Sequence, residues 1–208
     1  MKKGIFISLE GIEGTGKSTQ SKLLSESLSA AGYEVLLTFE PGGTRIGQRI
    51  REILLQPDHK EMSPVAELML YNAERNQHLH EVIFPALERG AVVITDRYTD
   101  STVAYQGYGR GIDIKLLKSI DAISTKGFMP DLTILFDLDV KTGLARNRGV
   151  NKVDRFELED VAFHEKVRSG YLELARLEPE RIKIIDASAD ARNIHKKVED
   201  IVMEMLCR

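Results

Sequence analysis

Near its start the chain reads Gly11-Ile12-Glu13-Gly14-Thr15-Gly16-Lys17-Ser18, followed by Thr19, and this stretch matches the pattern GxxxxGK[ST] at every fixed position. The motif directly follows an apolar run at 5–9 and leads into a helical pattern, the context in which it binds phosphate. Its glycines let backbone amides turn inward around an anion, and the following helix adds the positive end of its dipole. We expect Lys17, as an exposed loop residue, to reach the β- and γ-phosphates and the Ser18 hydroxyl to ligate Mg²⁺. The stretch therefore predicts a nucleoside triphosphate site.

Outward from this loop, short apolar runs alternate with helical patterns. The expected strands are 5–9, 35–39, 91–95, 132–138 and 182–185, each apolar on both faces. The expected helices are 17–31 with Gly32 as C-cap, 46–55, 64–90 with Ser63 as N-cap, 114–125, 159–177 and 191–206. This alternation predicts an α/β fold of three layers, in which helices cover both faces of a five-stranded parallel sheet. Such sheets bind ligands beyond the carboxyl ends of their strands.

Length and composition narrow the class of protein. The 208 residues suit a single domain, 1–208. The 29 basic and 32 acidic residues give a net charge of −3, which argues against disorder and against a nucleic-acid partner. One cysteine, Cys207, allows neither an internal disulfide nor a thiolate zinc cluster and favours a cytoplasmic location. Glu10 interrupts the first apolar run, so we expect no signal peptide and no membrane partner.

A second nucleotide motif points to a different class, a GTPase-like switch. Asn151-Lys152-Val153-Asp154 matches the NKxD pattern that reads guanine, and Ser188-Ala189 resembles an SA motif. However, the first of these follows the polar stretch 146–149 and not a buried strand. The third expected strand ends in Asp96-Arg97-Tyr98-Thr99, which lacks the glycine of a switch motif. These contexts favour an enzyme over a switch.

Two further polar clusters are expected at the same edge of the sheet. Glu40-Pro41-Gly42-Gly43-Thr44-Arg45 follows the second strand, and Asp96-Arg97-Tyr98 follows the third, with 100–107 just beyond. Taken singly, the first is more often a plain turn and the second a structural ion pair. Together they bring arginines beside a phosphate loop, and a planar guanidinium binds phosphate oxygens through two hydrogen bonds. We therefore expect a second phosphorylated ligand.

These motifs, at 10–19, 40–44 and 96–107, resemble those of the thymidylate kinases, P-loop nucleoside monophosphate kinases, and the resemblance extends from residue 5 to the C-terminal helix. It implies the P-loop NTPase fold and transfer of the γ-phosphoryl of ATP to dTMP, with Mg²⁺ carried by the nucleotide. ATP would bind at 11–19. Besides Ser18, Asp96 is expected at the metal, either as a partner of the groups that bind Mg²⁺ or as a group that orients an arginine. The resemblance also implies a homodimer packed through helices, with the apolar stripe of 63–90 as a candidate surface. Another nucleoside monophosphate kinase or a deoxynucleoside kinase is the alternative.

The resemblance assigns further residues to dTMP. They are Glu13, Arg45, Tyr71, Arg75, Arg97, Thr102, Tyr105 and Gln106. In this set Glu13 would accept a hydrogen bond from the sugar 3′-hydroxyl, because a carboxylate can accept and a hydroxyl can donate. Tyr105 would lie against the deoxyribose and leave little room for a 2′-hydroxyl.

Two positions depart from the family pattern. Tyr71 stands where the family usually has a phenylalanine that stacks on thymine, and stacking survives the added hydroxyl. The alternative for Tyr71 is a core residue of an amphipathic helix. Phe39 replaces an arginine found in many bacterial relatives, which would leave the monophosphate dependent on Arg45 and Arg97. Arg45 is equally explained as a solvated residue at the start of a helix.

A mobile lid is expected at about 143–157, where a polar stretch carries several basic residues. The expected catalytic residues are Lys17, Arg97, Arg146 and Arg148. Some thymidylate kinases carry an arginine at the position of Glu13, and the resemblance implies that a loop without it is complemented by lid arginines. Composition alone favours a solvated basic face instead. Arg155, next to Asp154, is expected to pair with it.

Overall fold

Five parallel strands form one sheet in the computed structural model, which describes residues 4–147 and 154–207. The strands are β1 (Ile5–Glu10), β2 (Val35–Phe39), β3 (Val92–Asp96), β4 (Leu132–Asp137) and β5 (Ile182–Asp186), in the spatial order β2-β3-β1-β4-β5. Every neighbouring pair is parallel. The expected sheet is confirmed, because each strand agrees with its expected range to within one residue at either end.

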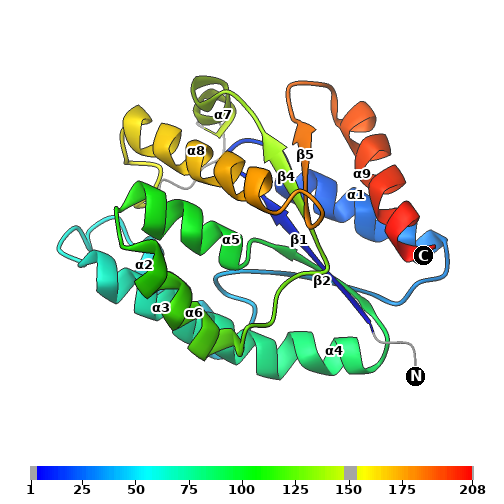
Figure 1. Cartoon of the computed structure of the whole chain (residues 1–208), viewed down its shortest axis with the longest axis horizontal. Coiled ribbons are helices and arrows are strands. Elements are labelled where there is room, and N and C mark those ends of the chain that lie inside the picture. Colours follow the sequence, from blue (N-terminus) through cyan, green and yellow to red (C-terminus); the bar gives the residue numbers. More distant parts are fainter. Residues whose placement is uncertain (1–3, 148–153, 208) are drawn as a thin grey trace.

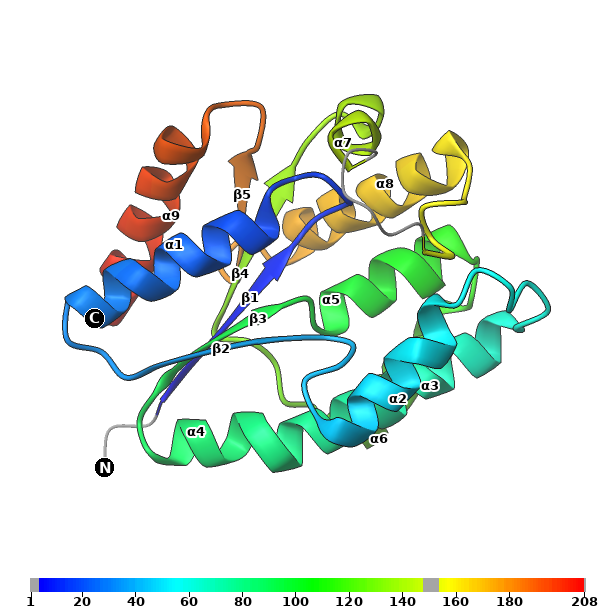
Figure 2. The same ribbon diagram turned by 180° about the vertical axis from the view of Figure 1, so that it is seen from behind.

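Helices cover both faces of this sheet (Figures 1 and 2). On one face, α1 (Lys17–Ala30) and α9 (Ala191–Leu206) pack side by side and bury Leu24 and Val198 against Ile7 of β1. On the other face, α8 (Val161–Leu177) packs Val167 into a core that also contains Leu135 of β4. Successive strand residues point to opposite faces, so both sides of the central strands are apolar. The expected three layers are confirmed.

The long helical pattern at 64–90 forms a continuous helical segment. It comprises α3 (Pro64–His78), a π-helical turn η1 (Leu79–Ile83) and α4 (Phe84–Glu88). The Ser63 hydroxyl accepts a hydrogen bond from the backbone N–H of Ala66 at 3.3 Å, as expected of an N-cap. Two more helices, α2 (Arg45–Leu55) and α6 (Ile114–Thr125), pack on either side of α3. Within the described residues, no helix has the length and apolar character needed to cross a membrane.

The structure contains three helical segments that the sequence does not predict. They are α5 (Thr99–Thr102), the π-helical turns η2 (Val103–Gly109) and α7 (Val140–Asn147). All residues from 99 to 107 are buried, so the segment α5–η2 shows no alternation of polar and apolar faces. The helix α7 spans only eight residues, fewer than the window over which helical periodicity is recognised.

The two outer strands differ from the expectation that every strand is covered on both faces. In β2, Leu37 and Phe39 are exposed, and in β5 so is Ile184. These strands have a neighbour on one side only, and the helices reach less far over them (Figure 2). The apolar side chains at the end of β2 therefore face the edge at which the loops of the site gather.

Candidate functional site

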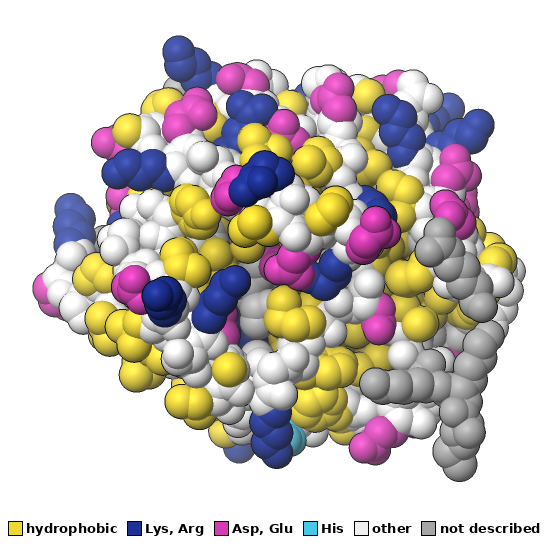
Figure 3. Space-filling view, in the orientation of Figure 1, with side chains coloured by type: hydrophobic (Ala, Val, Ile, Leu, Met, Phe, Trp, Pro, Cys, Tyr) yellow, Lys and Arg dark blue, Asp and Glu magenta, His cyan; other side chains and the backbone are white. Residues whose placement is uncertain are grey.

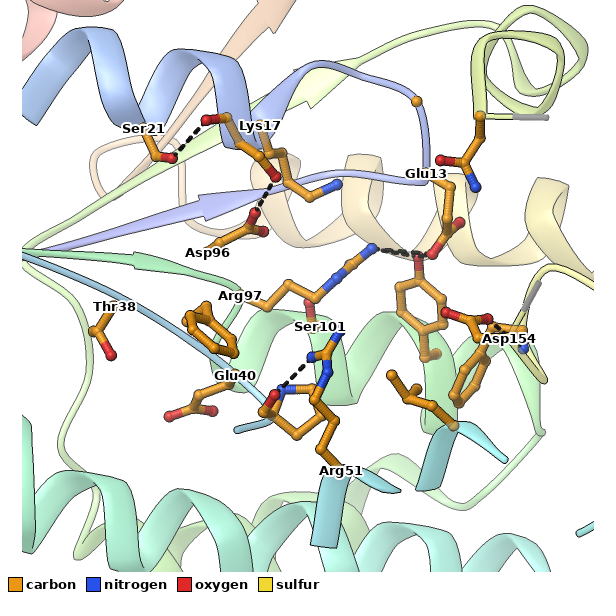
Figure 4. A pocket seen from close by; sticks show the side chains of 18 of the residues that line it. Glu13, Lys17, Ser21, Thr38, Glu40, Arg51, Asp96, Arg97, Ser101 and Asp154 are labelled. Atoms are coloured by element: carbon orange, nitrogen blue, oxygen red, sulfur yellow. Dashed lines mark hydrogen bonds and ion pairs between the residues drawn. The ribbon is translucent and has the colours of Figure 1, made fainter. Parts of the chain in front are cut away.

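A cavity of about 820 Å³ opens beyond the carboxyl ends of β1, β2 and β3 (Figure 4). Its lining includes most residues expected from the sequence: Glu13, Gly14, Gly16, Lys17, Ser18, Thr19, Tyr71, Arg75, Asp96, Arg97, Thr102, Tyr105, Gln106 and Arg146. The remaining residues of the phosphate motif, Gly11, Ile12 and Thr15, lie in the same loop without lining the cavity. The loop after β1 and the helices after β2 and β3 thus meet around one hollow, as parallel sheets arrange them.

The glycines of the phosphate loop are required by its geometry. Gly11, Gly14 and Gly16 have φ values of +139°, +73° and +88°, a region that residues with a Cβ rarely adopt. A Cβ on Gly14 would lie 2.0 Å from the backbone oxygen of Gly143 in α7. The loop therefore closes against α7 with no room for a side chain at that point.

Lys17 is buried, in contrast to the expected exposed loop lysine. Its Nζ donates to the backbone oxygens of Gly11 at 2.9 Å and Ile12 at 2.8 Å. Burial, and then the nearby charge of Arg97, lower the pKa of this ammonium to about 8. The carbonyl oxygens of the loop thus hold the Lys17 ammonium beside the cavity, where it can bind an anion.

Ser18 and Asp96 lie together, as expected of residues that share a metal ion. The Ser18 hydroxyl donates to Oδ2 of Asp96 at 3.0 Å, and both side chains line the cavity. A hydroxyl and a carboxylate are oxygen ligands of the kind Mg²⁺ takes together with substrate phosphates and water. The described residues contain no group of three or more His, Cys, Asp or Glu side chains arranged to hold a metal by themselves. The pair therefore fits Mg²⁺ that arrives with a nucleotide.

Glu13 and Arg97 form the centre of the cavity (Figure 4). Arg97 donates from Nη2 to Oε1 of Glu13 at 3.0 Å, and the Tyr105 hydroxyl donates to the same oxygen at 2.5 Å. The Arg97 guanidinium also lies over the Tyr105 ring, 4.8 Å from its centroid. Burial opposes ionisation of Glu13, yet His164, Arg97 and Lys17 together hold its pKa well below the usual range. A charged carboxylate and a guanidinium are thereby fixed next to the phosphate loop.

Glu10, at the end of β1, anchors the segment that carries Arg97. It is fully buried and accepts hydrogen bonds from the Tyr98 backbone N–H at 2.7 Å and from the Ser101 hydroxyl at 2.5 Å. Burial, and then the neighbouring charge of Asp100, raise its pKa to about 7. This carboxyl connects the first strand to the turn after β3 and so aims Arg97 at the cavity.

The far end of the cavity is aromatic and buried. Tyr71 of α3 lines it, 6.3 Å between ring centroids from Phe156, whose ring in turn meets that of Tyr105 edge-on at 5.6 Å. Arg75 is 1% exposed, with Nε donating to Glu40 and Nη1 to Thr102, both at 2.8 Å. The expected base-binding residues are thus brought together at one end, with Arg75 held as part of the wall.

The Glu-Pro-Gly-Gly turn after β2 is held from beneath by α3. Oε1 of Glu74 accepts from the backbone N–H groups of Gly42 at 2.8 Å and Gly43 at 3.3 Å. A Cβ on Gly43 would lie 2.3 Å from the His78 ring, which Glu40 itself contacts at 3.0 Å. The glycine requirement here comes from packing against α3, and Glu40 orients Arg75.

Arg45 does not lie with the other residues expected to bind dTMP. Arg45 begins α2, is exposed and does not line the cavity, whereas Arg51 of the same helix does. The Arg51 guanidinium lies over the Phe39 ring, 5.7 Å from its centroid, and donates to the Pro41 oxygen at 2.6 Å. The sequence does contain a signal for Arg51, because it shares the i, i+4, i+7 stripe of the helix with the two buried residues, Gly47 and Leu54.

The expected lid is described in part. Arg146 lines the cavity and donates to the Ala187 oxygen at 3.0 Å, whereas Arg148 lies outside the described residues, as do Asn151, Lys152 and Val153 of the NKxD pattern. The expected pairing of Arg155 with Asp154 is wrong. Arg155 is buried and pairs instead with Glu67 of α3, while Asp154 accepts from backbone N–H groups of its own turn.

Comparisons with known proteins agree on one family. The family model for "Thymidylate kinase" matches residues 9–198. A thymidylate kinase of an Exiguobacterium species is 48% identical over 203 residues, covering 98% of this chain and 96% of the relative. The thymidylate kinase of Pseudomonas fluorescens is also 48% identical, covering 99% of this chain and 98% of the relative. A crystal structure of thymidylate kinase from Ehrlichia chaffeensis superposes with a TM-score of 0.79 at 33% identity, covering 97% of this chain and 99% of that one.

Proposed function

The chain belongs to the thymidylate kinase family, whose reaction transfers the γ-phosphoryl group of ATP to dTMP and yields dTDP and ADP, and we propose that the two nucleotides meet in the cavity between Lys17 and Arg97. One observation carries the assignment of the site. The phosphate loop and the Glu13–Arg97–Tyr105 cluster open into the same cavity of about 820 Å³. This arrangement suits an in-line transfer between two bound phosphates, which needs positioning and charge neutralisation but no covalent intermediate.

On the ATP side, we propose that residues 11–19 hold the triphosphate. The amides of the glycine-rich turn and the N-terminus of α1 supply donors, and Lys17 leaves the carbonyl oxygens of Gly11 and Ile12 for the phosphate oxygens. Ser18 and Asp96 would hold Mg²⁺, which neutralises phosphate charge when it is bound with ATP. ATP binding would then favour the charged form of Lys17, whose pKa burial lowers to about 8 in the free loop.

On the dTMP side, we propose that Arg97 and Arg51 bind the monophosphate. Glu13, which already accepts from Tyr105, would accept from the 3′-hydroxyl, and Tyr105 would exclude a 2′-hydroxyl. Tyr71 would stack on thymine, since its ring lines the aromatic end of the cavity. The base would also meet the side chains of Arg75, Thr102 and Gln106.

We propose that 1–208 acts as one domain with a lid at about 143–157. Arg146 supports this reading because it lines the cavity from α7, the helix that packs on the phosphate loop. With Arg148, it would stabilise the charge that develops on the transferring phosphoryl group. Residues that act on the transferring group raise the rate without tightening dTMP binding.

We propose that the enzyme is a homodimer that packs through α2, α3 and α6. Exposed apolar side chains are spaced along all three helices: Ile46 and Ile53, Val65 and Met69, Leu116 and Ile123. Hydrophobic side chains are visible over α6, the helix of this set that faces the viewer in Figure 3. Both α2 and α6 pack against α3, and large exposed apolar side chains on neighbouring helices are of the kind that mark interaction surfaces.

A coupled assay with ATP tests the assignment against its alternatives. The chain is assayed with dTMP, dUMP, AMP, CMP, GMP and thymidine as acceptors, with and without Mg²⁺. We expect turnover with dTMP to exceed turnover with every other acceptor and to require Mg²⁺. Equal or better turnover with another monophosphate or with thymidine would reassign the acceptor. GTP binding without acceptor-dependent turnover would support the switch instead.

A further inference from the structure

Glu67, on α3, is a fully buried carboxylate that does not line the cavity and yet contacts a residue that does. Its Oε1 accepts from Nε2 of Gln106 at 2.9 Å and from Nε of Arg110 at 3.2 Å. Its Oε2 accepts from Arg155 and, at 3.4 Å, from Nη2 of Arg110. Three side chains, two from the segment 106–110 and that of Arg155, thus converge on one carboxylate.

The chemistry of these partners determines which way the Gln106 amide is turned. A guanidinium has no acceptor, and both oxygens of Glu67 already accept from arginines. Only the amide nitrogen of Gln106 can therefore hydrogen-bond to Glu67, because the amide oxygen of Gln106 would face a carboxylate oxygen, which is also an acceptor. The amide oxygen is left over, and no hydrogen bond reaches that oxygen from any residue within 4–147 or 154–207.

The Gln106 side chain belongs to the aromatic end of the cavity. It is 2% exposed and lines the cavity together with Thr102 and Tyr71. Its free oxygen is an acceptor beside the place proposed for the base. An acceptor at that place suits a pyrimidine that carries an N3–H, as thymine and uracil do, and it opposes cytosine, whose N3 is itself an acceptor.

We propose that Glu67 is a positioning residue that sets base selection by holding the Gln106 amide with its oxygen toward the nucleotide. The proposal rests on the proposed dTMP site and adds the origin of its preference for bases with an N3–H. Discrimination is strong at a site built in this way, because the wrong base leaves a buried polar group unpaired. The arginines take part indirectly, since they donate to both oxygens of Glu67.

The test compares two selectivity ratios, each a quotient of kcat/KM values, in the parent and in Glu67→Gln. A glutamine at position 67 can present either nitrogen or oxygen, so the Gln106 amide is no longer held in one orientation. We expect the dTMP/dCMP ratio to fall by about tenfold or more, a typical cost of one lost base contact. The dTMP/dUMP ratio should stay within about twofold, since both bases carry N3–H. A general distortion of the pocket would change both ratios.

Two further variants make the test decisive. Arg110→Met removes a partner of Glu67 but keeps its bond to Gln106, and should leave both ratios unchanged even if the protein is less stable. In a Gln106→Met background, Glu67→Gln should cause no additional loss of dTMP/dCMP selectivity, as expected when two residues act through one contact. If Glu67→Gln does not fold, the pair Glu67→Met with Arg155→Met replaces a buried ion pair by apolar side chains and carries the same expectation.

The outcomes separate this proposal from the proposed function. If the parent enzyme does not turn over dTMP, the proposed function fails. If the parent prefers dTMP to dCMP and the folded Glu67 variants keep that preference within about twofold, the function stands and the role of Glu67 is refuted.

Discussion

Arg97 takes its position in the site with an unfavourable backbone conformation. Its φ of +77° lies in the left-handed region, which is unfavourable for a side chain of this kind. The strain is offset by its surroundings, because its backbone N–H donates to the Leu9 oxygen at 3.0 Å and the next N–H donates to Glu10. A strained residue held by buried partners is typical of functional positions.

Two of the three arginines of α2, Arg45 and Arg51, give a matched test of the monophosphate site. Arg51 lines the cavity, whereas Arg45 is exposed outside it. We expect Arg51→Ala to raise the KM for dTMP about tenfold or more, because a charge-assisted hydrogen bond contributes about 1.5–3 kcal/mol. Arg45→Ala should stay within about twofold. Steady-state kinetics with varied dTMP measures both, and equal effects of the two substitutions would remove Arg51 from the site.

Glu74 predicts a dependence of stability on pH. Burial, and then the charge of Glu40, raise its pKa from 4.5 to about 7, so between these values the folded state binds more protons than the unfolded state. Its contribution to stability is therefore complete below about pH 4.5 and is lost as the pH rises to about 7. Glu74→Gln removes this dependence. We expect the variant to gain up to about 3 kcal/mol relative to the parent across that window, at about 1.4 kcal/mol per pH unit.

Urea unfolding of both proteins at several pH values measures this difference. Because the amide oxygen of the new glutamine can still accept from the Gly42 backbone N–H, the turn that Glu74 supports is retained in the variant. A stability difference that stays constant from pH 4.5 to 7 would show that the raised pKa of Glu74 is wrong.

At this scale, prediction from sequence succeeds where function depends on contiguous residues. Lys17 and Ser18 begin the helix after β1, and Asp96 is the last residue of β3, so their place at the edge of the sheet follows from the order of the chain. Arg51 is not predicted as a site residue, because its position at the cavity depends on which side of α2 faces inward. The pairing of Arg155 with Glu67 joins residues 88 positions apart, and no local pattern encodes such a contact.

At the scale of elements, strands and amphipathic helices are predicted well, and helices buried all round are not. The strands of the sheet and the capped helix that begins after Ser63 have clear periodicity or end signals. The segment α5–η2 has neither, although it supplies Thr102, Tyr105 and Gln106 to the cavity. Resemblance to a family identifies its residues, and only the structure shows their helical setting.

The contact between α7 and the phosphate loop gives a prediction at this scale. A Cβ on Gly143 would lie 2.6 Å from the backbone oxygen of Glu13, so Gly143→Ala must displace the loop or the helix. We expect kcat/KM for ATP to fall about tenfold or more, even though alanine favours a helix by about 1 kcal/mol over glycine. Lys141→Ala, an exposed position of the same helix, is the control. If the two variants are equally active, α7 does not shape the loop.

A substitution of Arg146, three residues further along α7, tests whether this segment acts as a lid. Arg146→Ala should lower kcat by on the order of 10² and leave the KM for dTMP within about twofold, as expected for a group that acts on the transferring phosphoryl. Arg176→Ala, which removes an exposed arginine paired with Glu173 on α8, serves as the control. A kcat within about threefold of the parent, which is less than 1 kcal/mol, would favour the solvated-face interpretation.

At the scale of the whole molecule, the order of the strands explains why the site forms where it does. The first strand lies in the middle of the sheet, between β3 and β4, so the loop after it is surrounded by the loops of its neighbours. Buried apolar clusters on both faces hold these strands. The cavity is therefore built on a rigid edge, while α2 and α7 approach it from outside the sheet.

The apolar area on α2, α3 and α6 predicts the state of association. Val65 and Met69 lie one turn apart on α3, are 47% and 51% exposed, and would be covered in a dimer. We expect light scattering to give twice the 23.4 kDa chain mass, and the double variant Val65→Glu with Met69→Glu to shift the protein toward one chain mass, because charges at the core of an interface are costly to bury. Leu177→Glu, at a similarly exposed position at the end of α8, should leave the dimer intact. A parent protein of one chain mass, or dissociation by Leu177→Glu alone, would refute this surface.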